Sequence, residues 1–153
     1  MENNFNLNAD LIDLHLDVKS PEDAIYKSGM MLVKTALVEL SYLDGMLHAY
    51  KDLGPYIVIA PQVAMPHSKP GLGVNKPSYA FARLKKPIPF GHSEHDPVHI
   101  VIPVAGIDHT SHIGMLRNIA GVLSDPKNFA KLLKTENKQE IATLFNNGTQ
   151  RKG

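Results

Sequence analysis

The chain has 153 residues, of which 43% are hydrophobic and 20% are charged, and its formal net charge at pH 7 is +1. This length suits one domain, which we expect to span residues 1–153 and to bury roughly 68–70% of the surface that its unfolded chain exposes. The near-neutral charge, without any Lys/Arg run longer than two residues, excludes the basic footprint of a nucleic-acid-binding protein.

The sequence also limits where the protein works. No apolar stretch approaches the roughly 20 residues needed to cross a bilayer, and residues 1–4 lack the basic and apolar regions of a signal peptide. We therefore predict a cytoplasmic protein that does not insert into a membrane. The chain has no cysteine, so disulfides and any thiol step within this chain are excluded.

The N-terminal third predicts one strand followed by two helices. Apolar residues alternate with polar ones over residues 12–18, which is typical of a half-buried strand. Ser20, a proline and two acids then predict a helix over Pro21–Val38. A second helix is expected from a Ser41/Asp44 capping pair to Leu53, where Gly54-Pro55 ends it.

The remainder alternates short strands with helices. The expected strands are Tyr56–Ala60, Val63–Met65, Ser78–Leu84 and the almost wholly apolar Val98–Val104. The expected helices are His109–Leu123, one opened by Asp125-Pro126, and Asn137–Phe145, before a frayed tail over Gln150–Gly153. This order predicts an α/β fold with helices covering a sheet.

One histidine follows a segment with little backbone freedom. In the run Ala64-Met65-Pro66-His67, Pro66 fixes its own φ and favours an extended Met65, so His67 should leave the end of a strand in a defined direction. A neutral imidazole is nucleophilic near pH 7, because its ordinary pKa is about 6.5. We predict that His67 accepts a phosphoryl group, with no metal, cofactor or carboxylate base required.

A second histidine lies at a predicted helix start. His112 belongs to the helix that follows the apolar strand, and Asp108, Thr110 and Ser111 surround the helix terminus. Free N–H groups and partial positive charge at a helix N-terminus suit phosphoryl oxygens. We expect His112, assisted by the hydroxyl or amide groups of Thr110 and Ser111, to stabilise a phosphorylated His67.

These residues carry a family resemblance. The block Gly54-Pro55-Tyr56-x-Val58-x-Ala60-Pro61-x-x-Ala64-Met65-Pro66-His67-x-x-Pro70-x-x-Gly73-Val74 resembles the IIA component of the bacterial sugar phosphotransferase system (PTS), mannitol/fructose class, ascorbate-type branch. The likeness continues through 84–90, Asp96-Pro97-Val98 and Ser111-His112, and is one of pattern more than residues in the N-terminal third.

The resemblance implies a fold and a function. It implies an α/β fold with a mixed, about five-stranded sheet flanked by helices. It also implies that the phosphocarrier HPr phosphorylates His67 and that His112 helps hold the phosphoryl group. The group then passes to a cysteine of a IIB component, which phosphorylates the sugar as the membrane component IIC imports it. The ascorbate branch implies ascorbate as that sugar, with related pentitol or other sugar-acid systems left open. Because this chain has no cysteine, IIB must be a separate chain.

One segment departs from the mannitol-type pattern. Relatives of that type carry an arginine near the end of the second helix, where this chain reads Leu47-His48-Ala49-Tyr50-Lys51. Either Lys51 replaces that charge or the site works without it. The departure agrees with the ascorbate branch rather than with mannitol specificity.

Two other functions compete with the phosphocarrier. A regulatory IIA-like module would signal by its phosphorylation state, and the sequence does not separate it from a transport component. A metal-dependent hydrolase would use part of the eight histidines, whose candidate ligands are His92, His95, His99, His109 and His112 with Asp96 or Asp108. No tight metal-binding pattern occurs among them, and His99 is more typical of a sheet-face histidine.

Several residues near the candidate site have two interpretations. Met65, Ile113 and Met115 are either core residues or part of a small apolar surface on which a carrier protein docks. Lys85-Lys86 before Pro87 predicts a solvated turn.

Overall fold

The structure, a computed structural model, describes residues 5–150 and contains five α-helices and seven short strands within that range. The helices are α1 (Pro21–Lys34), α2 (Leu40–Leu53), α3 (His109–Leu123), α4 (Pro126–Lys134) and α5 (Lys138–Gln150). The strands are β1 (Ile12–Leu16), β2 (Val58–Ala60), β3 (Val63–Ala64), β4 (Ser78–Tyr79), β5 (Phe81–Ile88), β6 (Val98–Val101) and β7 (Val104–Ala105). Single turns of 3-10 helix occupy Ala9–Leu11 and Pro55–Ile57.

The main sheet is mixed and has five strands in the order β1-β5-β6-β3-β2. β1 is parallel to β5 and β3 is parallel to β6, whereas β5 with β6 and β2 with β3 are antiparallel. β4 and β7 pair antiparallel as a separate two-stranded sheet. The predicted α/β fold with a mixed five-stranded sheet is confirmed.

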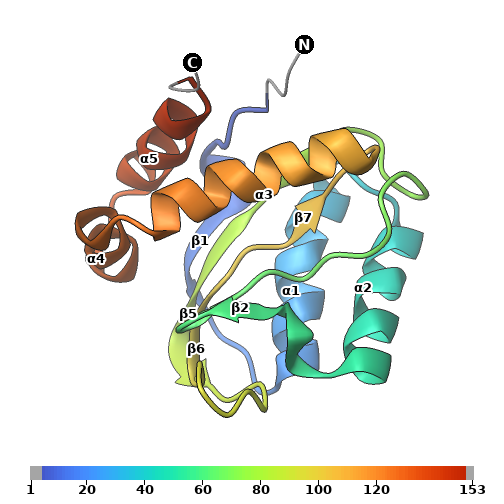
Figure 1. Cartoon of the computed structure of the whole chain (residues 1–153), viewed down its shortest axis with the longest axis horizontal. Coiled ribbons are helices and arrows are strands. Elements are labelled where there is room, and N and C mark those ends of the chain that lie inside the picture. The colour runs from blue at the N-terminus through green and yellow to red at the C-terminus, as the bar shows by residue number, and fades with distance from the viewer. Residues whose placement is uncertain (1–4, 151–153) are drawn as a thin grey trace.

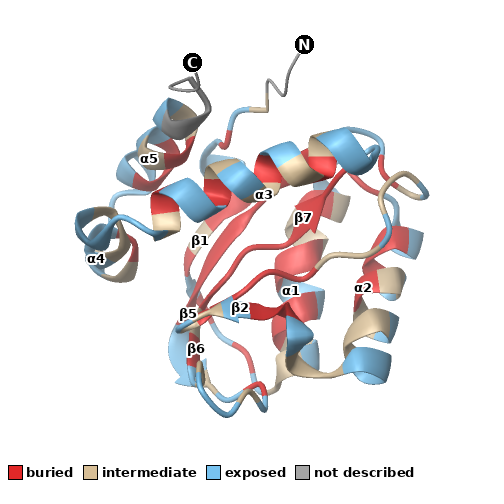
Figure 2. Cartoon of the chain, in the orientation of Figure 1, coloured by how far each residue is buried: buried red, intermediate tan, exposed pale blue. Residues whose placement is uncertain are grey.

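The helices cover the sheet on its two sides (Figure 1). α3 lies across the front of the strands, while α1, which contacts β5 and β6, lies behind them beside α2. α5 contacts α3 and β1, and the Asn146 side chain of α5 bonds both the amide and the carbonyl of Leu7. Buried residues concentrate on the strands and on the inward helix faces (Figure 2).

The first two helices differ from their predicted bounds. α1 ends at Lys34 instead of Val38, because Ala36 takes a left-handed conformation with φ 62° that interrupts the helix. α2 begins after Glu39, which makes no side-chain cap, so the predicted Ser41/Asp44 capping pair is wrong. The Glu39 carboxylate instead accepts a hydrogen bond from Asn75 Nδ2 at 2.9 Å.

Two predicted strands are each divided between the two sheets. Residues 98–104 form β6 and then β7, because Pro103 has no N–H with which to continue a ladder. Residues 78–84 likewise form β4 and the beginning of β5. β5 continues to Ile88, so Lys85 and Lys86 lie exposed in a strand and the predicted turn is wrong.

The other elements follow their predictions to within a few residues. α3 has its predicted bounds, His109–Leu123, and the strand predicted over 12–18 is shortened to Ile12–Leu16. The predicted strand Tyr56–Ala60 begins instead as a 3-10 turn and is extended from Val58. α5 runs to Gln150 instead of ending at Phe145, so the predicted frayed tail is wrong at Gln150; the rest of that tail, 151–153, and the N-terminal residues 1–4 lie outside the described residues.

Candidate functional site

The two candidate histidines follow neighbouring parallel strands. β3 leads to His67 and β6 leads through β7 to His112, and the pairing of the two chain segments continues beyond the strands themselves. The amide of Ile102 donates to the Ala64 carbonyl at 2.9 Å, and the amide of Val104 donates to the Pro66 carbonyl at 2.9 Å. The carboxyl ends of these strands therefore bring both histidines to one edge, where open α/β sheets place their sites.

A glycine loop closes this edge. After His67 the chain turns through Gly71 and Gly73, whose φ angles of 103° and 81° favour glycine. The Gly71 amide donates to the Gly106 carbonyl at 2.9 Å, which joins the loop to the segment leading into α3.

The His67 ring is held by its own chain. Its Nδ1 lies 2.8 Å from the Met65 carbonyl oxygen, and His67 is half-buried. Because a carbonyl can only accept, Nδ1 carries the proton in the neutral ring and Nε2 carries the lone pair. The Tyr56 ring packs edge-on against this imidazole, with ring centres 5.6 Å apart.

His112 lies beside His67. The two ring centres are 5.2 Å apart and their planes are inclined by 55°. His112 is 8% exposed, and its Nδ1 is buried without a hydrogen-bond partner among the described residues. Burial, followed by the nearby His67 and His109, lowers the pKa of His112 below its ordinary value, so the ring is neutral at neutral pH.

The start of α3 is closed by its own capping box. The Asp108 carboxylate accepts from the Ser111 amide at 2.8 Å. The Ser111 hydroxyl accepts from the amides of Ile107 at 2.9 Å and Asp108 at 3.2 Å. The Ser111 amide and hydroxyl are thus used in the cap, while Thr110 is exposed.

The ambiguous methionines are core residues. Met65 is 1% exposed and Met115 is 0% exposed, so neither side chain offers a surface to a ligand or a carrier protein. Met65 contributes to the site through its carbonyl oxygen. Ile113 is half-buried.

The exposed apolar side chains near the site differ from the three named above as a possible docking surface. Tyr56 is 39% exposed, Leu72 is 87% exposed and Ile107 is 41% exposed. Leu72 lies in the loop that bonds to Gly106, and Ile107 follows Gly106 directly. Tyr56 belongs to the conspicuous block around His67, whereas Leu72 and Ile107 gave no signal in the sequence.

The remaining candidates are not brought into the site. Lys51 is exposed in the last turn of α2, and within residues 5–150 it makes no hydrogen bond or ion pair. His92 and His95 stack with ring centres 4.4 Å apart in the loop between β5 and β6. Among the described residues, no three His, Asp or Glu side chains gather as a group that could hold a metal ion.

Comparisons with known proteins agree with the geometry. A sequence model of the family described as "Phosphoenolpyruvate-dependent sugar phosphotransferase system, EIIA 2" matches residues 5–148. The chain belongs to this family. EIIA components are phosphotransfer proteins of the sugar phosphotransferase system. No helix within the described residues is long and apolar enough to cross a membrane.

The similar proteins include an ascorbate-specific component and two structures of a mannitol enzyme IIA. The ascorbate-specific PTS system EIIA component of Shigella boydii is 36% identical over 136 residues, which cover 88% of each chain. Enzyme IIA of the Escherichia coli mannitol system, solved in complex with phosphorylated enzyme IIB, is 28% identical with a TM-score of 0.81 over 91% of this chain and 96% of that chain. The crystal structure of E. coli IIA mannitol is 28% identical, with a TM-score of 0.80 over 92% of this chain and 99% of that chain.

Proposed function

We propose that this protein is a phosphoryl carrier that accepts phosphate from phospho-HPr on Nε2 of His67 and passes it to a cysteine of a separate IIB component. The observation that carries the proposal is the hydrogen bond between His67 Nδ1 and the Met65 carbonyl, with the His112 ring beside it. A ring held in this way has a fixed orientation and leaves Nε2 as its one nucleophilic nitrogen.

The first step moves the phosphoryl group without a proton exchange. The Nε2 lone pair attacks the phosphorus of phospho-HPr, and the P–Nε2 bond forms as the P–N bond of HPr breaks. The electron pair of the broken bond returns to the HPr imidazole, which leaves as the neutral ring with the proton it already carried. His67 becomes a phosphorylated imidazolium, and its Nδ1–H stays bonded to the Met65 carbonyl, which stabilises the positive charge.

His112 is placed to hold the transferred group. Its buried Nδ1 has no hydrogen-bond partner in the part of the chain that the structure describes, so the neutral ring keeps its proton on Nε2, which can donate to a phosphoryl oxygen. A donor aimed at the equatorial oxygens is the main contribution that a protein makes to phosphoryl transfer. Its lowered pKa keeps the ring neutral, so it does not repel the imidazolium of phosphorylated His67.

The second step reverses the first with a different partner. A IIB thiolate attacks the phosphorus, the P–S bond forms, and the electron pair of the P–Nε2 bond returns to Nε2. This leaves His67 neutral and ready for another cycle. The E. coli mannitol enzyme IIA, which has the same fold, forms a complex with phosphorylated IIB, and this supports a IIB partner here.

Both partners need a shared docking surface, since the HPr imidazole that leaves and the IIB thiolate that attacks must each lie in line with the P–Nε2 bond. The exposed side chains of Tyr56, Leu72 and Ile107 belong to the segments that surround the histidines and supply apolar area for brief encounters. The sugar itself does not contact this chain. The ascorbate-specific EIIA relative supports ascorbate as the sugar that IIB phosphorylates while the membrane component IIC imports it.

The test is intact-mass analysis after incubation with phosphoenolpyruvate, enzyme I and HPr. Wild type should gain one acid-labile phosphate, and His67→Ala should gain none. His109→Ala is the matched control, because His109 is the exposed histidine nearest to His112 in the sequence and should leave the modification intact.

A second reaction tests the transfer onward. Phosphorylated protein mixed with a IIB component should lose its phosphate to the IIB cysteine, and a Cys→Ser variant of IIB should not accept it. An unmodified wild type would end the phosphocarrier proposal. Phosphorylation without transfer to any IIB tested would favour the regulatory alternative.

A further inference from the structure

The buried Tyr42 hydroxyl lies between the two segments that carry the histidines. Tyr42 belongs to α2 and is 2% exposed. Its hydroxyl donates to the Val104 carbonyl at 2.7 Å and accepts from the Ser68 amide at 3.0 Å. Burial raises the pKa of Tyr42 to about 12, so the hydroxyl keeps its proton and makes both bonds at any physiological pH.

This position coincides with a missing bond of the parallel ladder. In a regular parallel pair, a residue makes two hydrogen bonds to the neighbouring strand. Its N–H donates to the carbonyl of one residue on that strand, and its C=O accepts from the amide of the residue two positions later on the same strand. Val104 makes the first of these bonds, to the Pro66 carbonyl at 2.9 Å. The second would join the Ser68 amide to the Val104 carbonyl, and the Tyr42 hydroxyl stands between these two groups.

The residue between the two ladder positions is His67. Pro66, on one side of it, has no N–H to donate, and Ser68, on the other side, is separated from Val104 by a hydroxyl group. The backbone at His67 is therefore free of a direct ladder bond on its C-terminal side, and the Ser68 amide and the Val104 carbonyl bond the Tyr42 hydroxyl instead. With the backbone spaced in this way, the His67 ring turns back so that its Nδ1 bonds the Met65 carbonyl.

We propose that Tyr42 is a positioning residue whose hydroxyl spaces Ser68 from Val104 and so sets the direction of the His67 ring. The inference deepens the proposed function, because the nitrogen it directs is the one to which phosphoryl transfer is assigned. Tyr42 does not touch the phosphoryl group in this account. It acts through the backbone of the segment that carries His67.

The variant Tyr42→Phe removes one oxygen atom and keeps the ring. Without the hydroxyl, the Ser68 amide and the Val104 carbonyl either approach each other to bond directly, which moves the His67 backbone, or remain unpaired, which removes the bond that holds Ser68 in place. We expect phosphorylation by phospho-HPr to slow at least about tenfold, since a misplacement of about 1 Å can cost about 100-fold. Hydrogen exchange of the Ser68 amide should quicken, and the nitrogen chemical shifts of His67 should change from the Nδ1–H tautomer to a mixture.

Tyr50→Phe is the matched control. Tyr50 also belongs to α2, and its hydroxyl also donates to a backbone carbonyl at 2.7 Å, but that carbonyl belongs to Phe90 and not to a segment that carries either histidine. This variant should keep the wild-type rate, the wild-type Ser68 exchange and the wild-type His67 nitrogen shifts.

The tautomer measurement separates this inference from the proposed function. It is made on unphosphorylated protein, so it tests the role of Tyr42 even if phospho-HPr fails to modify wild type. A Tyr42→Phe protein with wild-type rate and wild-type His67 shifts would overturn the inference. So would a slowed rate with unchanged His67 shifts, because a purely structural or docking effect would then explain the loss.

A second variant covers the case in which Tyr42→Phe does not fold. Tyr42→3-fluorotyrosine keeps the hydroxyl and the ring shape but makes the oxygen a poorer acceptor. Ser68 exchange should then quicken and the transfer rate should fall in the same direction by a smaller factor. Unchanged values of both would overturn the inference.

Discussion

A Cβ atom placed on Gly106 would lie 2.6 Å from the Cβ of His112 and 2.9 Å from its backbone nitrogen. Carbon atoms in contact prefer about 3.5–4.0 Å, so the first turn of α3 can pack this closely on the end of β7 only because residue 106 has no side chain. The closeness of His112 to His67 depends on this contact.

The first prediction concerns Gly106→Ala. The added methyl group must push α3 away from β7, which should lower the free energy of unfolding by about 1–3 kcal/mol. It should also slow phosphorylation of His67 by up to about 100-fold, because His112 moves with the helix. Urea unfolding and the rate of phosphorylation by phospho-HPr measure the two effects.

Gly121→Ala is the control for that substitution. Gly121 lies in the same helix, and a Cβ built on it meets nothing within 4 Å. Replacing a helical glycine with alanine should raise the free energy of unfolding by about 0.5–1 kcal/mol and leave transfer unchanged. Equal transfer rates in the two variants would contradict the role given to Gly106.

The second prediction separates His112 from His67. In His112→Ala the nucleophile and its Met65 carbonyl bond remain, so one phosphate should still appear on His67. The rate should fall about 10²–10³-fold, which is typical for the loss of one donor to a developing charge. Single-turnover kinetics with phospho-HPr measure this. A wild-type rate in His112→Ala would remove His112 from the mechanism.

The third prediction follows from the lowered pKa of His112. The folded protein binds this proton less readily than the unfolded chain, whose histidines titrate near about 6.5. Below that pH the unfolded state takes up a proton that the folded state does not, so the free energy of unfolding should fall as the pH decreases. One such group lowers the free energy of unfolding by at most about 1.4 kcal/mol for each pH unit. The decrease stops below the pKa of His112 in the folded state, where both states bind the proton.

Urea unfolding between pH 7.5 and pH 5 measures this contribution. The curve of His112→Gln should fall less steeply than that of wild type. Equal slopes for wild type and His112→Gln would contradict the expected titration.

Much of this site could be predicted from the sequence, because its determinants are local. Pro66 restricts the chain before His67, and Asp108 begins α3 at the predicted residue, so both candidate histidines were placed at the ends of their elements. The rule that sites lie beyond the carboxyl ends of parallel strands then brings His67 near His112, as their 5.2 Å ring separation bears out.

The features that could not be predicted from the sequence depend on contacts between residues far apart in the chain. The bond between Tyr42 and Val104 joins residues 62 positions apart, and no local pattern indicates it. The burial of Met115 depends on how α3 is rotated against the sheet. The end of α1 depends on Ala36, an ordinary helix former that takes a left-handed conformation here, and the strand at Lys85-Lys86 depends on pairing with β6.

The fourth prediction concerns Ser111. Its hydroxyl accepts from two amides at the start of α3, so we expect it to cap the helix rather than to bind phosphate. Ser111→Ala should lower the free energy of unfolding by about 1 kcal/mol, as the loss of a helix cap usually does. Transfer should change only a few-fold, with exposed Thr110→Ala as the comparison. A 100-fold loss of rate in a stable Ser111→Ala protein would place the hydroxyl at the phosphoryl group instead.

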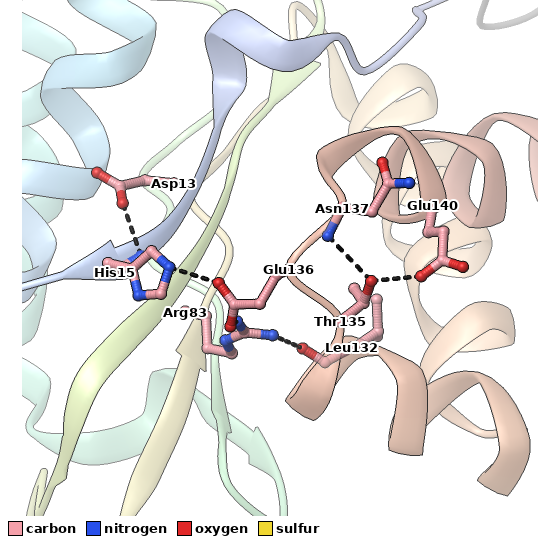
Figure 3. Close-up of polar contacts among 8 residues, drawn as sticks. All are labelled: Asp13, His15, Arg83, Leu132, Thr135, Glu136, Asn137 and Glu140. Carbon is pink, nitrogen blue, oxygen red and sulfur yellow. Dashed lines mark hydrogen bonds and ion pairs between the residues drawn. The ribbon is translucent and has the colours of Figure 1, made fainter.

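The last prediction concerns a polar network at the β1 edge of the sheet, away from the histidine pair (Figure 3). Arg83 of β5 is 8% exposed, and its guanidinium donates to the Leu132 carbonyl at 3.1 Å and to Glu136 at 2.7 Å. Glu136 also lies 2.6 Å from Nε2 of His15 on β1. The network therefore ties two strands to the segment that joins α4 and α5.

The two charges of this network should differ in importance. Glu136 is exposed, so Glu136→Gln should lower the free energy of unfolding by less than about 1 kcal/mol. Arg83→Ala should lower it by about 1–3 kcal/mol, because a buried carbonyl loses its donor and the packed stem of the side chain is removed. Neither variant should alter phosphorylation of His67 by more than about twofold, since additivity holds for distant sites. A large loss of transfer in folded Arg83→Ala would instead show that the α4–α5 edge is coupled to the site.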